Sequence, residues 1–513
     1  MRVGKKMATD KMKESEVVEL VAEYLLEKGF TATHESLQSE RKSPPKPQGR
    51  KGVRDTGTRL ESLLEKSHVA HMFGGNPSKR RRVHLDAILN EDPKDEVEVA
   101  AKEEEQVRKD AATPEVSLAT QIAGYNPAKD DPYGASSMPI YQTSTFAQPS
   151  ATTFGDYDYS RSGNPTRAAL EKHIAELEGG YKAFAFSSGM AALSAVTRLV
   201  KPGQEIILND DSYGGTYRLL SKVAQRNNIL VKYVDMSGQA GPANLSAKIS
   251  ENTKLVMIES PTNPMQRILN ISDICKIAHS KGALVEIDST MMSPVLQNPI
   301  PLGADIIVHS ATKFISGHAD TMAGVVVVKD HKLAGDIYFY QNAEGTGLSP
   351  FDSWLLLRGV KTMHIRVEKQ QENALAVAEF LRDHSMISHV YYAGLPSHPD
   401  HQLHMKQARG GGSVICFRTG SLELSQHVVS TTKHFKITVS FGSVNSLISL
   451  PGAMSHASIP AEVRAVRNFP EDLIRISVGI ETAADLIKDL SDAFSSYKPT
   501  ASAAVIKATP VAN

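Results

Sequence analysis

Seven short runs of apolar residues follow one another in the middle of the chain, and helix-length segments separate most of them. The runs contain mainly Ile, Val, Leu, Phe and Ala, and they occupy residues 183–186, 205–208, 229–234, 255–259, 284–288, 305–309 and 324–328. Near-continuous apolar strands that alternate with helices are typical of a mainly parallel sheet covered on both faces. The pattern therefore predicts an α/β domain with a seven-stranded sheet and helices such as 191–200, 217–226 and 271–280.

The pattern of apolar and polar residues changes after residue 368. The pattern predicts a long helix over 367–383 and strands at 390–392, 414–417 and 474–477. We therefore expect a large domain with an N-terminal arm over 117–368, followed by a smaller C-terminal α/β domain over 369–498.

The first 116 residues have another composition. Residues 13–40 carry apolar side chains at helical spacing, and Gly29 suits a helix C-cap. A helical hairpin this small cannot bury its own apolar stripe, so it would dimerise or dock onto a partner. Residues 41–116 are rich in Pro at their start and in charge further on, which predicts a largely flexible linker.

Two short motifs lie in this N-terminal part. Residues 19–30, with Thr33 and Leu37, closely resemble a LisH (lissencephaly homology) motif, a small helical dimerisation module; the alternative is an unrelated amphipathic helix. The basic cluster Lys79-Arg-Arg-Arg-Val83 has the composition of a nuclear import signal, although such clusters are more often solvated surface patches.

Composition narrows the possible surroundings and partners. Lys plus Arg and Asp plus Glu both number 57 in 513 residues, so no overall field favours nucleic acid or acidic lipid as the main partner. The only two cysteines, Cys275 and Cys416, suit a reducing compartment. No apolar run is long enough for a membrane span, Met1 to Asp10 lack a following apolar region, and early acidic residues disfavour a transit peptide. We expect a cytoplasmic protein.

Polar residues stand where the predicted strands end. Asp210, Glu259, Asp288 and Ser310 each end or closely follow one of the apolar runs. In open α/β sheets, ligands bind outside the carboxyl ends of the strands. The sequence therefore places a candidate site at this edge of the sheet.

Lys313 is the most informative residue at this edge. It lies between the apolar run 305–309 and a glycine-containing turn, with Ser310 and Thr312 beside it. A buried lysine charge is costly, and forming a Schiff base with a carbonyl cofactor removes it. The neighbouring hydroxyls suit a phosphate, so the motif indicates pyridoxal 5′-phosphate.

Two further segments are consistent with this cofactor. Residues 187–190 form a Ser-Ser-Gly turn between a strand and a helix, where free N–H groups can bind phosphate. Asp288 ends a strand before Lys313, and a protonated pyridine nitrogen would supply the cation that a buried carboxylate needs. An ordinary turn and a helix-capping Asp are the alternatives.

Three other side chains complete the candidate site. Tyr213, next to Gly214 and Gly215, can stack on the ring of the cofactor. Arg161 lies in an irregular arm and can clamp a phosphate, although most such arginines are surface charges. Arg475 is flanked by apolar residues on a predicted strand without an acidic partner, which favours the α-carboxylate of an amino-acid substrate as its ligand.

These residues, in this order, resemble the Cys/Met-metabolism family of fold-type-I pyridoxal-phosphate enzymes from about Ser117 to about Tyr497. Within the family, the motifs are most similar to the plant-type cystathionine β-lyase branch at residues 284–295, 309–318, 344–352, 369–374 and 439–444. This branch converts L-cystathionine to homocysteine, pyruvate and ammonia in methionine biosynthesis. The family is usually tetrameric with shared active sites, so the resemblance implies a homotetramer.

The resemblance also implies a role for each site residue. Lys313 would be the Schiff-base lysine and proton shuttle, Asp288 the partner of the ring nitrogen, and Tyr213 the stacking residue that assists proton transfer. Asn263 would bind near the cofactor oxygen or the substrate. The phosphate would be held by Ser188, Gly189, Met190, Ser310 and Thr312, with Tyr159 and Arg161 from a neighbouring subunit, and the substrate carboxylate by Arg475 and Ser440.

Two positions favour β-elimination within the family. Val439 stands where γ-lyases and γ-synthases commonly carry Glu, and Gly215 where methionine γ-lyases carry Cys. Ser289 and Ser443 depart from the usual Asn and Gly of the family. The alternatives are a cystathionine γ-lyase or γ-synthase on the same scaffold and a non-catalytic LisH scaffold. No metal site is expected.

Overall fold

The computed structural model describes residues 116–125, 131–455, 462 and 469–499. The LisH-like segment 13–40 and the basic cluster 79–83 lie outside these residues. The chain divides into two units, Met1–Thr113 with Ala147–Asp158, and Pro114–Phe146 with Tyr159–Asn513. In the first unit, the Gln148 side chain closes a loop, because its Oε1 accepts from Gly155 N at 2.8 Å and its Nε2 donates to Tyr157 O at 2.9 Å.

The second unit contains a seven-stranded sheet in the order β1-β7-β6-β5-β4-β2-β3. All seven predicted strands are present, and the prediction of a mainly parallel sheet is confirmed. Only β7 runs antiparallel to its neighbours β1 and β6. The strands are β1 (Lys182–Phe186), β2 (Glu205–Asn209), β3 (Leu230–Val234), β4 (Thr253–Glu259), β5 (Leu284–Asp288), β6 (Ile306–His309) and β7 (Gly324–Val328).

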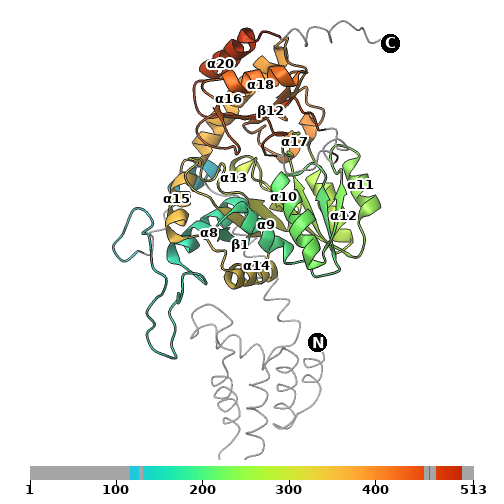
Figure 1. Cartoon of the computed structure of the whole chain (residues 1–513). Helices are drawn as coiled ribbons and strands as arrows, with labels where there is room; N and C mark the ends of the chain where they lie inside the picture. Colours follow the sequence, from blue (N-terminus) through green and yellow to red (C-terminus); the bar gives the residue numbers. More distant parts are fainter. Residues whose placement is uncertain (1–115, 126–130, 456–461, 463–468, 500–513) are drawn as a thin grey trace, which may run out of the picture. The chain divides into compact units, whose positions relative to one another are not determined.

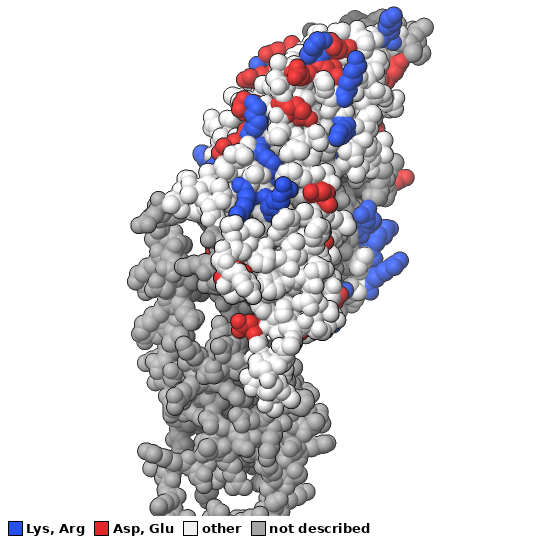
Figure 2. All heavy atoms as spheres, turned by 90° about the vertical axis from the view of Figure 1, so that its left-hand side faces the viewer, with Lys and Arg blue, Asp and Glu red and all other residues white. Residues whose placement is uncertain are grey.

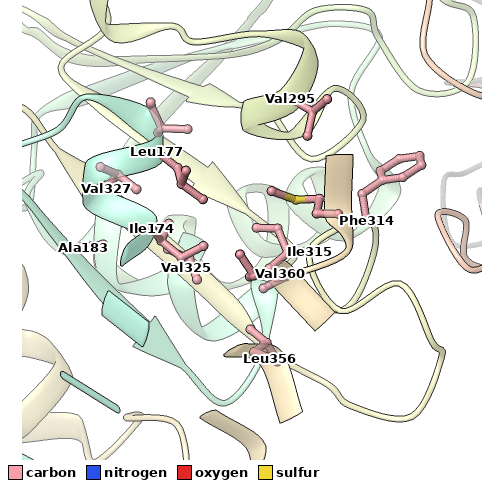
Figure 3. Packing of buried hydrophobic residues seen from close by; sticks show 14 of the residues in the cluster. Ile174, Leu177, Ala183, Val295, Phe314, Ile315, Val325, Val327, Leu356 and Val360 are labelled. Atoms are coloured by element: carbon pink, nitrogen blue, oxygen red, sulfur yellow. The ribbon is translucent and has the colours of Figure 1, made fainter. Parts of the chain in front are cut away.

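Both faces of this sheet are buried, which explains why its strands are apolar without alternation. On β7, Val325 and Val327 pack with α8 (Pro165–Glu178) and α15 (Pro350–Val360), as Figure 3 shows. Val326 and Val328 face the opposite way, toward α9 (Gly189–Thr197) and α14 (His331–Glu344). Further along the sheet, α11 (Gly241–Lys248) and α12 (Ile271–Ser280) cover β4 and β5.

The helix predicted over 217–226 differs in detail. An α-helix, α10 (Gly214–Arg218), continues as a π-helix over Leu219–Ala224 and a 3₁₀ turn over Gln225–Asn227. The helix begins at Gly214, three residues earlier than predicted. It ends at Asn228, whose φ of 57° is left-handed.

The second sheet has the order β10-β11-β12-β9-β8. Its strands are β8 (His389–Tyr391), β9 (Val414–Arg418), β10 (Lys436–Ile437), β11 (Leu447–Ser449) and β12 (Leu473–Ser477). The prediction missed β10 and β11, which are two and three residues long and too short to show a pattern. The helices that pack with this sheet are α16 (Met363–Asp383), α18 (Leu422–Thr431) and α20 (Ala483–Ser496) (Figure 1).

The expected boundary between the two domains, 368/369, falls inside α16, which links the two sheets. The remaining helical elements are α7 (Leu118–Gly124), α13 (Ser293–Leu296), the 3₁₀ turn Ile300–Leu302 and α17 (His401–Gln407). None of the helices in the described ranges is long and apolar enough to cross a membrane.

Candidate active site

The carboxyl ends of β4, β5 and β6 lie side by side at one edge of the large sheet. Glu259 pairs with Asp288, and Asp288 pairs with Val308, one residue before the end of β6. The turn that carries Lys313 follows directly after β6. The predicted residues on these three strands therefore meet at the expected edge, because parallel strands end on the same side.

Lys313 reaches from this turn to a loop that precedes β11. Its Nζ donates a hydrogen bond to Ser440 Oγ at 2.5 Å and lies 5.2 Å from the centre of the Phe441 ring. Burial, and secondarily the nearby positive charge of Arg475, lower the pKa of Lys313 to about 8. An appreciable fraction of this amine is therefore neutral near neutral pH, as a nucleophile or base requires.

Asp288 is held in place by Thr290. The Thr290 N–H donates to Asp288 Oδ1 at 3.0 Å, and Thr290 Oγ1 accepts from Ser310 N at 2.8 Å. Burial raises the pKa of Asp288, and the hydrogen bonds from Thr290 partly counter this. Such a carboxylate gains from a cationic partner, for which a protonated ring nitrogen is suited.

The first turn of α9 lies against the residues that follow β6. A side chain at Gly189 would place its Cβ 3.0 Å from the Cβ of Ser310, so glycine is needed for this approach. Ser188 Oγ accepts from Ala191 N at 3.1 Å and caps the helix. Thr312 Oγ1 accepts from Ala323 N at 2.9 Å. The N–H groups of Gly189 and Met190 precede the first intrahelical bond of α9, and a helix N-terminus with hydroxyls beside it suits a phosphate.

Tyr213 stands at the N-terminus of α10 with its ring over Gly215. A Cβ at residue 215 would lie 2.3 Å from Tyr213 Cε1 and 2.9 Å from Met190 Sδ. The ring position of Tyr213 therefore depends on glycine at residue 215.

Arg475 is buried in β12, with 3% of its surface exposed. Its Nη1 donates to Asn263 Oδ1 at 2.9 Å, its Nη2 donates to Ser440 O at 3.1 Å, and its Cζ lies 5.5 Å from the Phe441 ring centre. Within the part of the chain that the structure describes, no carboxylate forms an ion pair with it. The sequence of the strand predicted that Arg475 has no acidic partner. Its contacts with the described residues agree with this prediction.

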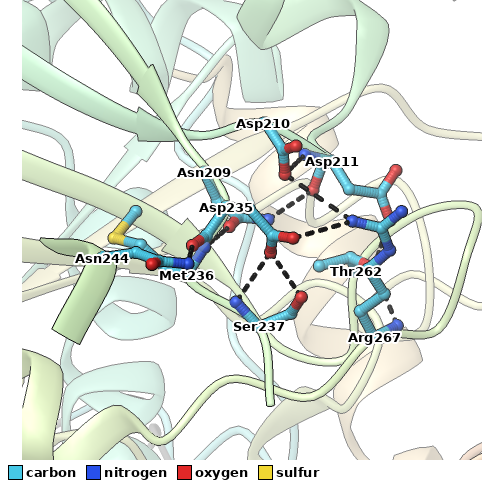
Figure 4. Close-up of polar contacts among 9 residues, drawn as sticks. All are labelled: Asn209, Asp210, Asp211, Asp235, Met236, Ser237, Asn244, Thr262 and Arg267. Carbon is cyan, nitrogen blue, oxygen red and sulfur yellow. Dashed lines mark hydrogen bonds and ion pairs between the residues drawn. The ribbon is translucent and has the colours of Figure 1, made fainter. Parts of the chain in front are cut away.

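Polar contacts hold the loops that carry Tyr213 and Asn263 (Figure 4). After β2, Asn209 Nδ2 donates to Asp211 O at 2.9 Å, and Asp211 Oδ2 accepts from Thr262 Oγ1 at 2.5 Å. Asp210 lies 3.9 Å from Arg267 Nη1, which also lies 3.5 Å from Asp235 Oδ2. These contacts link the ends of β2 and β4, so the two loops are positioned together.

Tyr159 and Arg161 lie in the arm before α8. Arg161 Cζ is 5.5 Å from the Tyr159 ring centre, and the Arg161 carbonyl accepts from Arg167 Nη2 at 3.1 Å. That these two residues reach the site of a neighbouring subunit stays a prediction.

Comparison with known proteins assigns the chain to a family. The model of the family described as "Cys/Met metabolism PLP-dependent enzyme" matches residues 119–495. The chain is 57% identical over 383 residues to "Cystathionine beta-lyase, chloroplastic" of Arabidopsis thaliana, covering 75% of this chain and 82% of that protein. It is 50% identical over 379 residues to "Cystathionine beta-lyase" of Neurospora crassa, covering 74% and 81%.

A solved structure extends the similarity to the fold. The chain matches cystathionine gamma synthase from Xanthomonas oryzae pv. oryzae with a TM-score of 0.72 and 38% identity, over 75% of this chain and 98% of that one. The chain therefore belongs to the Cys/Met metabolism family of pyridoxal-phosphate-dependent enzymes, and the expected fold-type-I architecture is confirmed.

The residues at the sheet edge fit the cofactor of this family. An amine with a lowered pKa, a carboxylate at the end of the neighbouring strand, and a helix N-terminus that requires glycine all meet there. These groups match the aldehyde, the ring nitrogen and the phosphate of pyridoxal 5′-phosphate. No cluster of His, Cys, Asp and Glu that could hold a metal ion occurs in the described ranges.

Sequence analysis missed three neighbours of the site. Phe441 packs against both Lys313 and Arg475, and Thr290 joins Asp288 to Ser310. Both lie within motifs that the family resemblance singled out, but no local pattern marks their contacts. The third is Glu286, two residues before Asp288 on β5, whose alternating geometry places both on one face.

Glu286 lies in a small pocket below the strand ends. Glu259, Asp288, Ser212 and Thr216 also line this pocket. Glu286 is 1% exposed, and its Oε1 has no hydrogen-bond partner among the described residues. Burial, and then the charge of Asp288, raise the pKa of Glu286 well above its ordinary value.

We expect Glu286→Gln to stabilise the cofactor-free protein at neutral pH. The raised pKa means that the folded state binds more protons than the unfolded state, so stability is lost as pH rises above about 4.5. The Gln side chain does not titrate, so the variant does not lose this stability. Between the pKa of Glu286 in the unfolded state and its raised pKa in the folded state, each pH unit corresponds to about 1.4 kcal/mol. Urea unfolding at pH 5 and pH 8 should show a larger gain at pH 8, whereas Glu368→Gln at an exposed position of α16 should show none. Equal gains at both pH values would contradict this protonation state.

Proposed function

We propose that the protein is a cystathionine β-lyase, a carbon–sulfur lyase of methionine biosynthesis. The reaction is L-cystathionine plus water to homocysteine, pyruvate and ammonia. The proposal is supported by the relatives named cystathionine beta-lyase in Arabidopsis thaliana and Neurospora crassa.

The observation that carries the proposal is the buried Arg475 guanidinium beside the Lys313 amine. Arg475 makes its described polar contacts with an amide and a carbonyl oxygen, and its charge has no described carboxylate partner. An amino-acid substrate supplies a carboxylate that a planar guanidinium can bind through two hydrogen bonds. With the carboxylate fixed there, the substrate Cα would be held near Lys313.

In this proposal Lys313 binds the cofactor and moves the Cα proton, since its lowered pKa of about 8 leaves an appreciable neutral fraction. Bound pyridoxal 5′-phosphate supplies an electron sink that stabilises negative charge at Cα. Asp288 maintains the charge of the ring nitrogen, and Tyr213 stacks on the ring and assists proton transfer. Asn263 and Ser440, each of which provides an oxygen that the Arg475 guanidinium contacts, are proposed to bind the substrate beside it, and Asn263 also to bind near the cofactor oxygen.

The phosphate is assigned to the edge formed by α9 and the turn after β6. The residues proposed to bind it are Ser188, Gly189, Met190, Ser310 and Thr312, with Tyr159 and Arg161 supplied by a neighbouring subunit. The proposed homotetramer follows family analogy. Among the described residues, the face shown in Figure 2 has a broad area without Lys, Arg, Asp or Glu, and the cores of interfaces between proteins are depleted of charged residues.

Two positions favour β-elimination over γ-chemistry. Val439, beside Ser440, is 49% exposed and carries no charge, whereas γ-lyases and γ-synthases commonly carry Glu there. At residue 215, where methionine γ-lyases carry Cys, this chain has Gly, and a Cβ there would require the side chains of Tyr213 and Met190 to shift. The similarity to a cystathionine gamma synthase structure keeps γ-chemistry as the second candidate.

A product assay separates the two candidates. With L-cystathionine as substrate we expect pyruvate as the 2-oxo acid, detected by lactate dehydrogenase coupling and by mass spectrometry. Release of 2-oxobutyrate instead would refute β-lyase and support the γ-lyase. A purified protein without the visible absorbance of bound cofactor and without either product would support the non-catalytic scaffold.

The location and the N-terminal partner are also proposals. A cytoplasmic location is proposed because Cys275 and Cys416 are both free, as in a reducing compartment, although the Arabidopsis relative is named chloroplastic. Residues 13–40 are proposed to dimerise or bind a partner through the LisH-like motif, and residues 79–83 remain a candidate import signal. Neither nucleic acid nor a membrane is proposed as a partner.

A further inference from the structure

Arg366, near the start of α16, is buried without an acidic partner among the described residues. It is 4% exposed, and burial lowers its pKa to about 10. Its Nη1 donates to Phe314 O at 2.9 Å, and its Nη2 donates to Gly359 O at 2.7 Å and Ile315 O at 3.4 Å. Its Nε donates to Thr362 Oγ1 at 3.1 Å. All these acceptors are neutral oxygens, and two of them belong to the residues immediately after Lys313.

The turn over residues 313–317 is also closely packed at three glycines, where a side chain would collide with neighbouring atoms. A Cβ at Gly317, whose φ is 73°, would lie 1.8 Å from Arg366 Nη1. A Cβ at Gly359, near the end of α15, would lie 2.5 Å from Ser316 O. A Cβ at Gly442 would lie 2.8 Å from Phe314 N and 3.2 Å from Lys313 Cβ. The turn therefore has little space to move toward α15, α16 or the loop of the second sheet.

Arg366 joins these parts, because its planar fork holds the turn and the end of α15 at the same time. We propose that Arg366 is a positioning residue, which fixes the turn 313–317 so that the Lys313 amine stays against Ser440 and Phe441. This inference rests on the proposed role of Lys313. A lysine at residue 366 keeps the charge but has one nitrogen, which cannot reach the turn, Gly359 and Thr362 in the same geometry.

The first test measures the turn in the cofactor-free protein. In Arg366→Lys, hydrogen exchange of the amides in a peptide covering 310–318 should be at least about tenfold faster than in the wild type. The control is Arg409→Lys, since Arg409 contacts the carbonyls of Val295 and Pro294 at 2.8 and 2.5 Å and makes none of its described polar contacts with residues 313–317. The control should leave exchange in 310–318 unchanged.

The second test measures the amine and the reaction. Competitive acetylation of the cofactor-free protein across pH should show half-reaction of Lys313 at a higher pH in Arg366→Lys, because a looser turn lets water reach the amine. In the loaded enzyme, kcat should fall about tenfold to a hundredfold, as expected for a misplaced catalytic group, while KM changes less than about threefold. Free guanidinium ion added to Arg366→Ala should restore part of kcat.

Unchanged exchange in 310–318 together with an unchanged Lys313 titration would overturn the proposal. If the lysine variant does not fold, Thr362→Val is the second variant. It removes the acceptor of Arg366 Nε together with the weaker bond from Thr362 Oγ1 to Gly359 O at 3.3 Å, and it must still accelerate exchange in the same peptide. Borohydride reduction of the wild type separates this inference from the proposed function. If the reduced cofactor is found on Lys313 but Arg366→Lys changes neither exchange nor the Lys313 titration, only the positioning role of Arg366 is refuted. If the reduced cofactor is found on another residue, the role of Lys313 is refuted.

Discussion

Replacement of Lys313 by Ala is expected to abolish turnover of L-cystathionine, with kcat reduced at least about 10⁴-fold. A positioned general base alone contributes about 10²–10⁴-fold, and Lys313 is also proposed to bind the cofactor covalently. The fold should persist, because within the described ranges the side chain makes one hydrogen bond, to Ser440, and packs near a single ring. Circular dichroism and pyruvate release measure the two effects separately.

The matched control for this variant is Lys222→Ala, at an exposed position of the π-helix after α10, which should leave kcat unchanged. Borohydride reduction followed by peptide mapping should label Lys313 in the wild type and no residue in the variant. Added ethylamine should restore part of the activity, since the cavity left by the side chain adjoins Ser440 and Phe441. Turnover within tenfold of the wild type, or a label on another lysine, would disprove the assignment.

The large sheet could be predicted strand by strand because its signal is local. Seven runs of apolar residues, buried on both faces, leave no ambiguity between strand and surface loop, and the helix-length segments between most of them indicate a mainly parallel sheet. The order of the strands in space and the antiparallel direction of β7 have no such local signal. Short elements such as β10 and β11 carry too few residues for a period to appear. Their place depends on strand pairing, of β11 with β12 and of β10 with β11. The π-helical turn after α10 has no pattern in sequence either.

In the candidate site, too, some residues could be predicted from local patterns and others could not. Asp288 and Lys313 stand at strand ends, so the sheet topology alone brings them to one edge. That Ser440 binds the substrate carboxylate stays a prediction. The structure shows that its Oγ accepts from Lys313, 127 positions away, and that its carbonyl accepts from Arg475. Contacts of this kind come from how the second sheet docks, so the place of Phe441 could not be assigned from local patterns. Thr290 and Arg366 contact residues that are distant in sequence, Ser310 and Phe314, so no local pattern marks them either.

The other large effect is expected at Arg475. Arg475→Met should lower kcat/KM for L-cystathionine on the order of 10²–10³-fold, because truncating one partner of a buried charged pair costs about 2–5 kcal/mol. The loss should appear in both KM and kcat, since the carboxylate contact would also orient the Cα–H bond toward Lys313. Arg475→Lys should recover only part of the loss, as a single ammonium cannot form two parallel hydrogen bonds.

Stability distinguishes a substrate-binding arginine from a structural one. In the cofactor-free protein, Arg475→Met removes a buried charge that has no described carboxylate partner, and this gain offsets the lost contacts to Asn263 and Ser440. The free energy of unfolding should therefore change by less than about 1 kcal/mol. The titration of Lys313 should also move to higher pH, because the positive charge of Arg475 lowers the pKa of that amine.

Arg418, on the neighbouring strand β9, provides the control. Its Nε lies 2.9 Å from Asp472 Oδ1, and its side chain is 38% exposed, so Arg418→Met should cost at most about 1 kcal/mol of stability and leave kcat/KM unchanged. A structural arginine at 475 would give the reverse result: a large loss of stability in the cofactor-free protein, with kcat/KM per folded molecule preserved. That outcome would leave the buried guanidinium without a ligand and would remove the main physical support for an amino-acid substrate.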